Sequence, residues 1–212
     1  MDGELHNMIF ETLTVGPLAV NCYIIGSKKD NTAVVIDAGG HPEEIMNILK
    51  KHNLVLQFLL NTHAHFDHVG GVRYLQDQTK AKFLLHQCDI PLLNHLNDQT
   101  NAFGMPSVPV PKVEKVLLDN EELSVGNEIL RVIHTPGHSP GSVCFLMGDA
   151  LFSGDTLFAG SIGRTDFQGG SYAKIIDSIK TRLFTLGDHV IVYPGHGERT
   201  TIGEERQHNP FF

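Results

Sequence analysis

The chain has 212 residues, of which 41% are hydrophobic and 19% are charged, and a chain of this length can bury about 70% of its unfolded surface. No apolar stretch approaches the roughly 20 residues of a membrane span. The formal charge of −8, with no basic cluster larger than a pair such as Lys28-Lys29, argues against the basic footprint that nucleic-acid binding needs. We therefore expect one domain over residues 1–212, with neither nucleic acid nor a membrane as its partner.

The first half of the chain alternates strand and helix patterns. Predicted strands, recognised as short apolar or alternating runs, cover residues 8–15, 20–26, 32–37, 56–60 and 82–85. Predicted helices cover residues 42–52, 69–76 and 89–96. The first of these helices opens at Pro42-Glu43-Glu44, because proline and acidic residues are favoured in the first turn of a helix.

The second half contains one long segment without a periodic pattern, from Asn97 to Lys112, which carries three prolines. It is longer than a usual connection, and two interpretations stay open, a surface loop and a lid or wall of an active site. Further short strands are predicted at 130–133, 150–152 and 189–193. A helix is predicted over 171–186, and its core face is formed at helical spacing by Ile175, Ile176, Ile179 and Leu183.

The most informative feature is the segment His63-Ala64-His65-Phe66-Asp67-His68. Four metal-ligand side chains fall within six residues, directly after the predicted strand 56–60. They therefore lie on the loop at the carboxyl end of a strand, where α/β sheets build their sites. Crowded imidazoles with a carboxylate suit zinc or a similar transition metal. The alternative interpretation of this motif by itself is a solvated histidine-rich loop.

Three further predicted strands end in a similar way. His138 stands in a Pro-Gly-His-Ser turn after strand 130–133, Asp155 in Gly-Asp-Thr after 150–152, and His196 in Pro-Gly-His after 189–193. Glycines in these loops permit tight turns and a close approach of the backbone to an ion. Because scattered surface histidines would not recur at strand ends, the arrangement indicates one shared metal centre.

On these motifs the chain resembles the metallo-β-lactamase superfamily and, within it, the small glyoxalase-II-like hydrolases, from Asn21-Cys22-Tyr23 to Asn209-Pro210-Phe211. The resemblance implies an α/β fold, a four-layered αββα sandwich of two packed sheets with helices outside. It also implies two metal ions, zinc by preference, with iron or manganese as alternatives. The implied ligands of the first ion are His63, His65 and His138. Those of the second are Asp67, His68 and His196, and Asp155 bridges both ions.

The resemblance also implies a reaction, the hydrolysis of a small anionic thioester of the hydroxyacylglutathione type, such as S-lactoylglutathione, by a metal-bound hydroxide. Asp67 would orient the nucleophile or carry its proton while it coordinates the metal. A thiolate leaving group needs no strong general acid, because the pKa of a thiol is about 8.5.

The loop 158–167 corresponds to the family's thiol-substrate loop, and its implied substrate contacts are Arg164 and Phe167. Arg164 could instead pair with Asp166 or Glu198. Full-length glyoxalase II carries a C-terminal helical domain that completes its glutathione site, whereas the present sequence ends 16 residues after His196 (212 − 196 = 16). We therefore expect thioester hydrolysis with weak recognition of the glutathione tail.

Three other functions stay open. Persulfide dioxygenases share a similar Gly-Arg-Thr-Asp-Phe loop but use one iron, which His63, His138 and Asp155 would hold here. A lactonase or a β-lactamase would hydrolyse a different bond, but β-lactamases act outside the cytoplasm, and residues 1–4 have neither the basic region nor the apolar run of an export signal. A metal-stabilised binding module would carry out no turnover.

Cysteine usage favours a cytoplasmic protein. Cys22 and Cys144 lie in apolar strand-like runs and are interpreted as reduced core residues, whereas Cys88 has no assigned role. Asp37, at a strand end, either orients a metal ligand from behind or organises its own turn. The histidines that match no ligand position are expected on the surface or in satisfied core sites, and they are His6, His41, His52, His86, His95, His134, His189 and His208.

Overall fold

A computed structural model of the chain describes residues 8–212, so the expectation about residues 1–4 and the one about His6 lie outside the described residues. The strands are β1 (Met8–Val15), β2 (Val20–Ser27), β3 (Thr32–Ile36), β4 (Val55–Leu60), β5 (Lys82–His86), β6 (Lys115–Leu117), β7 (Glu122–Val125), β8 (Glu128–His134), β9 (Val143–Met147), β10 (Ala150–Gly154), β11 (Leu157–Phe158), β12 (Ser161–Ile162), β13 (Ile191–Pro194) and β14 (Thr200–Thr201). The helices are α1 (Pro42–Lys51), α2 (Phe66–Val69), α3 (Val72–Thr79), α4 (Ile90–Asn94), α5 (Leu96–Ala102), α6 (Tyr172–Ser178) and α7 (Ile202–His208). A 3-10 turn, η2 (Gln87–Asp89), precedes α4, and a π-helical turn, η3 (Ile179–Leu183), follows α6.

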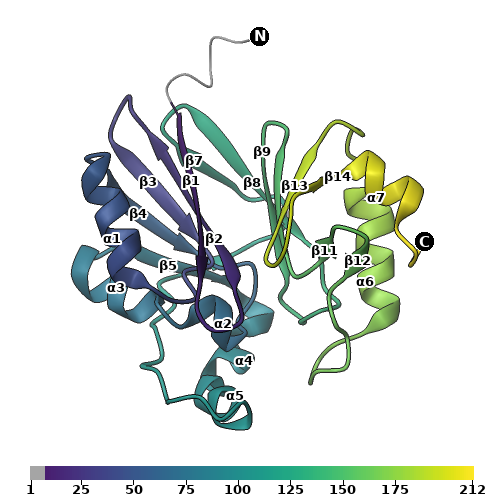
Figure 1. Ribbon diagram of the computed structural model, residues 1–212, viewed down its shortest axis with the longest axis horizontal. Coiled ribbons are helices and arrows are strands. Elements are labelled where there is room, and N and C mark those ends of the chain that lie inside the picture. The colour runs from purple at the N-terminus through teal and green to yellow at the C-terminus, as the bar shows by residue number, and fades with distance from the viewer. Residues whose placement is uncertain (1–7) are drawn as a thin grey trace.

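Two mixed sheets form the centre of the molecule (Figure 1). The first has the strand order β1-β2-β3-β4-β5-β6 and is parallel from β3 to β6. The second has the order β14-β13-β10-β9-β8-β7, in which β10 and β13 are parallel. Because parallel strands end at the same edge of a sheet, the loops that follow β4 and β5 share one edge, as do those that follow β10 and β13.

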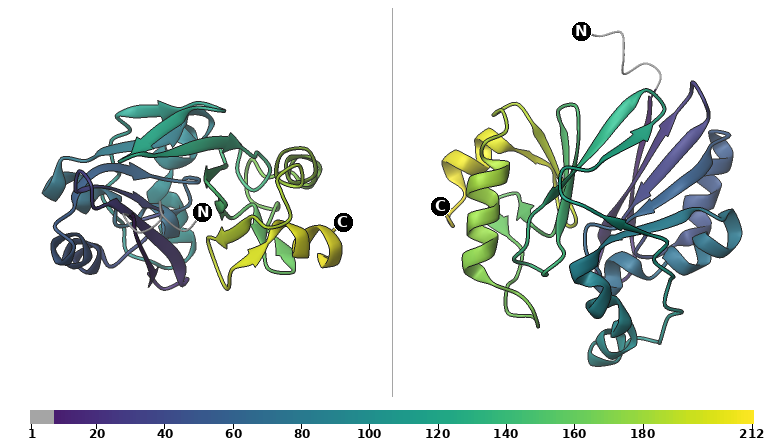
Figure 2. Two further views of the ribbon diagram at one scale, coloured as in Figure 1. Left: turned by 90° about the horizontal axis from the view of Figure 1, so that it is seen from above. Right: turned by 180° about the vertical axis from the view of Figure 1, so that it is seen from behind.

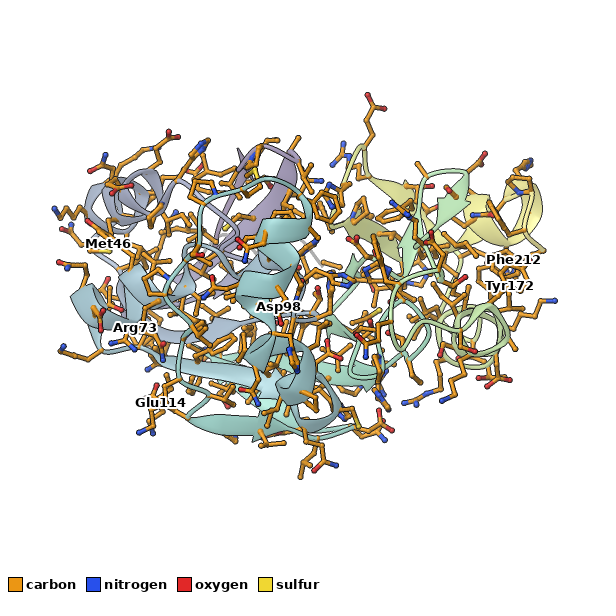
Figure 3. The ribbon with its side chains drawn as sticks, turned by 90° about the horizontal axis from the view of Figure 1, so that it is seen from below. Met46, Arg73, Asp98, Glu114, Tyr172 and Phe212 are labelled. Carbon is orange, nitrogen blue, oxygen red and sulfur yellow. The ribbon has the colours of Figure 1, made fainter. Side chains whose placement is uncertain are left out.

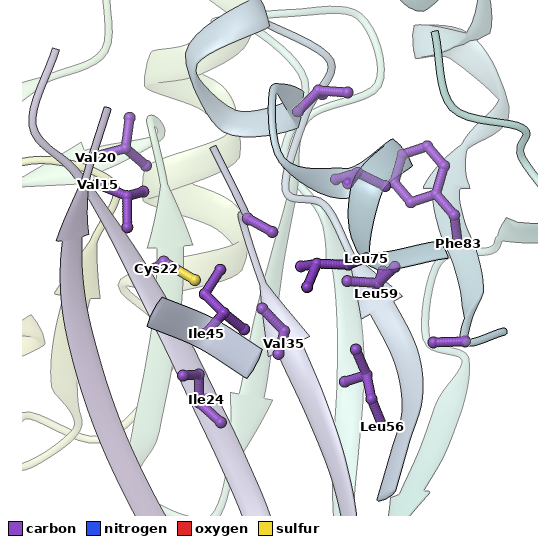
Figure 4. Packing of buried hydrophobic residues seen from close by; sticks show 14 of the residues in the cluster. Val15, Val20, Cys22, Ile24, Val35, Ile45, Leu56, Leu59, Leu75 and Phe83 are labelled. Carbon is purple, nitrogen blue, oxygen red and sulfur yellow. The ribbon is translucent and has the colours of Figure 1, made fainter. Parts of the chain in front are cut away.

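The first sheet is buried on both faces, because its side chains alternate between two hydrophobic clusters. Val34 of β3 belongs to the cluster between the two sheets, which also contains Phe145 of β9. Its neighbour Val35 belongs to the cluster on the outer face, where Ile45 of α1 and Leu75 of α3 cover the sheet (Figure 4).

A third cluster lies on the outer face of the second sheet, under α6 and η3. Ile175, Ile179 and Leu183 are buried in it, and Ile176 is partly buried against it, which confirms the predicted core face of this segment. The layers therefore run helix, sheet, sheet, helix (Figure 2), and the expected αββα sandwich is confirmed.

Several predicted element boundaries were wrong. The predicted helix 69–76 begins earlier and is interrupted at Gly70-Gly71, which separates α2 from α3. The predicted helix 89–96 is interrupted at His95, between α4 and α5. No element was predicted at β6, β7, β11, β12, β14 or α7, and β9 was indicated only by the apolar strand-like run around Cys144. Most of these are short and depend on pairing with strands distant in sequence, so the local pattern does not mark them.

The segment 97–112 is not irregular throughout, because its first residues form α5. Leu96 and Thr100 stand four residues apart and bury one face of this helix, and the three prolines lie beyond its end. No helix within residues 8–212 is both long and apolar enough to cross a membrane.

Candidate metal centre

The expected ligands meet where the loops after four strands come together. The segment from the end of β4 to the end of α2 contains His63, His65, Asp67 and His68. Helix α2 lies at the junction of the two sheets (Figure 1). His138 follows β8, Asp155 follows β10 and His196 follows β13. The structure places all seven residues in three overlapping groups whose ligand atoms lie within 4.8 Å of one another.

Three imidazole nitrogens converge in the first group, which consists of His63, His65 and His138. His138 Nε2 lies 2.9 Å from His65 Nδ1 and 3.2 Å from His63 Nε2. Nitrogens bound to a tetrahedral zinc ion at about 2.0–2.1 Å lie roughly 3.3 Å apart. The spacing of the three imidazoles therefore fits a metal ion between them.

Asp155 lies between this group and the second one, which contains Asp67, His68 and His196. His196 Nε2 is 3.4 Å from Asp67 Oδ2, and His68 Nε2 is 3.7 Å from the same oxygen. Asp155 Oδ2 is 3.6 Å from His138 Nε2 and 3.7 Å from His196 Nε2, while its Oδ1 is 3.4 Å from His68 Nε2. One carboxylate therefore reaches both groups, as a bridging ligand must.

Three atoms of the ligand residues are buried and have no hydrogen-bond partner among the described residues, namely His68 Nδ1, His68 Nε2 and Asp155 Oδ1. Of these, His68 Nε2 and Asp155 Oδ1 belong to the group of atoms that face one another in the centre. A buried polar atom without a partner costs about 1–3 kcal/mol, and coordination to a metal ion would remove that cost. The donor set of imidazole nitrogens and carboxylate oxygens suits zinc, and it also suits iron or manganese. The residues present therefore fit two divalent metal ions without selecting zinc.

Contacts behind the imidazoles orient their metal-facing nitrogens. Thr62 Oγ1 lies 3.0 Å from His63 Nδ1 and donates a hydrogen bond to Asp37 Oδ2 at 2.7 Å. His63 therefore donates from Nδ1, which leaves the lone pair of Nε2 free. Asp37 Oδ2 also lies 3.0 Å from His68 Nδ1, an ion-pair distance, although the two atoms form no hydrogen bond. Asp37 thus lies directly behind His68 and acts on His63 through Thr62, which is the first of the two roles considered for it.

Asp89, which the sequence analysis did not single out, connects two ligand loops. It is fully buried, and its Oδ2 accepts hydrogen bonds from Ala64 N at 2.9 Å and Ser139 Oγ at 2.7 Å. Its Oδ1 accepts a hydrogen bond from Gly141 N at 2.6 Å. Because Ala64 lies between two ligands and Ser139 follows His138, this one carboxylate sets the spacing of the first group. An acidic residue shortly after the predicted strand 82–85 was the available sequence signal.

The loop before His196 must pass very close to the other ligands, and Gly195 makes this approach possible. A Cβ atom at this position would collide with Asp155 Oδ1 and with His68 Cε1, which it would meet at 2.8 Å. His68 is fully buried and Asp155 is 12% exposed, so neither side chain has room to move away without displacing a ligand atom. The glycine is therefore required for packing rather than for a special backbone angle.

Burial keeps the imidazoles of His63 and His65 neutral, because it lowers the pKa of both. Burial and the neighbouring His138 lower the pKa of His65 to about 3, and burial also places the pKa of His63 well below its ordinary value. Burial acts to raise the pKa of Asp155, but the imidazole of His68 outweighs it and holds that pKa below the usual range. Free imidazole lone pairs and an ionised carboxylate are the states that metal ligation requires.

A cavity of about 730 Å³ opens over the ligands and is bordered by the two predicted substrate contacts, Arg164 and Phe167. Arg164 forms a bidentate ion pair with Asp166, at 2.9 Å and 2.7 Å, and its guanidinium carbon lies 4.3 Å from the centre of the Phe167 ring. The Phe167 ring lies 5.1 Å from that of His65. Arg164 also accepts a hydrogen bond from His138 Nδ1 at 2.8 Å through its backbone oxygen, so it orients a ligand whatever its side chain binds.

The opposite side of the cavity is formed by α5, whose position Asp98 marks in the view from below (Figure 3). Of the two interpretations of segment 97–112, the structure therefore supports the wall of a site. Gln99 joins this wall to the ligand loop, because its Oε1 accepts a hydrogen bond from Phe66 N at 3.1 Å and its Nε2 donates to Ala64 O at 3.3 Å. This role of Gln99 was not predicted, because a single glutamine carries no sequence signal for it.

The other histidines in the described part of the chain belong to none of the three groups. His134, only four residues before His138, stacks on His86 with the ring centres 4.1 Å apart. Cys22 and Cys144 are buried free thiols, as expected, and burial raises the pKa of both. Cys88 is exposed and also free.

Comparisons with known proteins agree with this geometry. A family model described as the metallo-beta-lactamase superfamily matches residues 15–196. Hydroxyacylglutathione hydrolase GloC of Haemophilus influenzae is 36% identical in an alignment 208 positions long, which covers 96% of this chain and 98% of that protein. The probable metallo-hydrolase YqgX of Bacillus subtilis is 36% identical in an alignment 216 positions long, which covers 96% of this chain and 97% of that protein.

Solved structures show the same fold at comparable identity. The B3 metallo-beta-lactamase BLEG-1 superposes with a TM-score of 0.88 at 38% identity, covering 96% of this chain and 99% of that one. The protein TTHA1623, solved in a di-iron-bound form, has a TM-score of 0.86 at 37% identity. The superposition covers 95% of this chain and 100% of that one. ETHE1 from Myxococcus xanthus has a TM-score of 0.79 at 30% identity, and the superposition covers 95% of this chain and 83% of that one.

Proposed function

The chain belongs to the metallo-β-lactamase superfamily, and from that premise we propose that it hydrolyses thioesters of the hydroxyacylglutathione type with two bound metal ions. The observation that carries the proposal is the position of Asp155, whose two oxygens reach both ligand groups. The similarity to GloC over nearly the whole of both chains supports the thioester as substrate. The di-iron form of TTHA1623 supports two ions but leaves their identity open between zinc and iron.

When bound, a pair of divalent ions supplies an acidic water molecule and a positive charge beside the carbonyl oxygen. The chain contributes a base at the same place. Burial acts to raise the pKa of Asp67, but His68 and His196 outweigh it and hold that pKa below the ordinary value. Asp67 is therefore ionised at neutral pH and lines the cavity, where it can accept the proton of the attacking water. The thiol product leaves as a thiolate without a strong general acid.

Arg164 is the side chain that we propose to contact a carboxylate of the thiol half of the substrate. It lines the cavity and is exposed, so a substrate can approach it from solvent. Its ion pair with Asp166 already satisfies one edge of the guanidinium group. A substrate carboxylate would therefore compete with Asp166 or share the arginine with it, and either way the contact is weaker than one to an unpaired arginine.

A second candidate function is an iron-dependent oxidation of the persulfide dioxygenase type, which the Gly-Arg-Thr-Asp-Phe sequence of residues 163–167 favours. In that case His63, His138 and Asp155 would hold a single iron, and the group around Asp67 would hold none. The similarity to BLEG-1 also raises β-lactam hydrolysis. These candidates differ in metal content and in the bond that breaks, so one set of measurements separates them.

The test uses protein purified without chelators, with elemental analysis followed by assays on S-lactoylglutathione, a lactone, nitrocefin and glutathione persulfide under air. We expect about two metal equivalents per chain and the largest kcat/KM for the thioester. A His138→Ala variant should lose the first metal equivalent and the activity together. One iron per chain with oxygen consumption on the persulfide would overturn the proposal, as would a larger kcat/KM for the lactone or nitrocefin.

A further inference from the structure

One side of the cavity is an apolar wall that begins next to the proposed reacting centre. We call it the α5 wall, and its residues are Phe66, Leu92, Ala102 and Phe103. Phe66 is the chain neighbour of Asp67, and its ring lies 5.0 Å from that of Phe103. Phe103 is 48% exposed, so a large aromatic face is left open to the cavity rather than buried in the core. Leu18, 42% exposed, extends the apolar lining.

The α5 wall is held in place independently of any ligand. Gln99 of α5 bonds to Phe66 N and Ala64 O of the ligand loop and donates to Leu92 O at 3.0 Å. Leu96, on the inner face of α5, is fully buried in the core cluster of the first sheet. Because the wall is attached both to the ligand loop and to the core, its distance from the metal ligands is set by the fold.

Apart from the metal ligands, the charged side chains that border the cavity do not favour binding of a charged substrate group at the α5 wall. Apart from the metal ligands, the side chains within residues 8–212 that line the cavity and can carry a positive charge are Arg164 and His95. Arg164 pairs with Asp166, and His95 Nδ1 lies 2.8 Å from Asp98 Oδ2 at the exposed mouth. Arg164 lies on the loop that follows β12, whereas the α5 wall is formed by residues of another part of the chain.

From these observations we infer that the substrate carries an apolar acyl group, several carbons longer than acetyl, which packs on the α5 wall against Phe103 and Phe66. The thiol half extends toward Arg164. The inference rests on the proposed thioester hydrolysis and specifies its acyl half. The reaction needs no other reactant, because water adds across the carbon–sulfur bond, giving the carboxylic acid, and the sulfur leaves with the remaining proton as a thiol.

The test is a series of glutathione thioesters that differ only in the acyl group, from acetyl through butanoyl to hexanoyl, assayed with the metal-replete protein. Each buried methylene of the acyl chain should raise kcat/KM by roughly three- to fourfold until the wall is covered. A kcat/KM that is constant or falls from acetyl to hexanoyl would overturn the inference.

The matched variants are Phe103→Ala and Phe211→Ala, since Phe211 is a similarly exposed phenylalanine (41%) that does not line the cavity. We expect Phe103→Ala to lower the hexanoyl-to-acetyl ratio of kcat/KM by about tenfold, and Phe211→Ala to leave the ratio as in the wild type. An unchanged ratio in Phe103→Ala would overturn the role of the wall. Turnover of S-lactoylglutathione with a flat series refutes this inference alone, whereas no turnover of any thioester refutes the proposed function and this inference with it.

Discussion

Replacing Asp89 by asparagine should weaken the first metal site while the fold is retained. The carboxylate accepts three hydrogen bonds, one of them from the backbone between two ligands and another from Gly141 in the His138 loop. Asparagine keeps one acceptor oxygen and turns the other into an N–H donor, so one backbone N–H of Ala64 or Gly141 loses its acceptor. A buried donor without an acceptor costs about 1–3 kcal/mol, and loss of an outer partner of this kind typically lowers metal affinity about 10–100-fold.

The assay is a competition of the protein with a chromophoric chelator, which reports the two metal affinities separately, together with thermal unfolding of the metal-free protein. The matched control is Asp119→Asn, because Asp119 also accepts a backbone hydrogen bond, from His134 N at 2.8 Å, and forms an ion pair with Arg182. Asp119 bonds to neither loop that Asp89 joins. An unchanged first metal affinity in Asp89→Asn, or an equal loss in Asp119→Asn, would refute the reasoning.

Four other changes test separate parts of the argument. Asp155→Ala should reduce bound metal from about two equivalents to one or fewer by elemental analysis, and two retained ions with full activity would contradict the bridging role. Asp67→Asn should lower kcat by about 10²-fold or more in steady-state assays through loss of the base, whereas wild-type turnover would remove that role. Arg164→Ala should raise KM by up to about tenfold for carboxylate-bearing thioesters and less for neutral ones; equal effects would indicate that the arginine is purely structural. Burial, followed by His134, lowers the pKa of His86 to about 4, so the unfolded chain binds a proton near pH 6.5 that the folded one does not. Stability should therefore be fully present above about pH 6.5 and fall by up to about 3 kcal/mol as the pH drops toward 4; in urea titrations of the metal-free protein, His86→Gln should flatten this fall, and an equal slope would count against it.

Much of the metal centre could be predicted from the sequence, because its signal is local. Four ligands stand within six residues, and the other three each follow a short apolar run at a glycine-bearing turn. Residues that directly follow parallel strands lie close together in space, because such strands end at the same edge of the sheet. The same local logic predicted the long strands and the core face of the last long helix pattern. It failed at the two-residue strands and at the breaks near Gly70 and His95, where pairing and packing decide rather than periodicity.

Only the tertiary structure decided what surrounds the metal centre. Asp89 bonds to a backbone group 52 residues away in the chain, and Gln99 holds α5 against a loop more than thirty residues earlier (|i−j| = 33 and 35). Neither residue differs in sequence from an ordinary surface acid or amide. Phe103 becomes part of a cavity wall only because α5 is anchored beside the ligand loop. Ligand identity is encoded in residue type and short spacing, whereas the orientation of ligands and the shape of the cavity depend on contacts between distant segments, which no local pattern specifies.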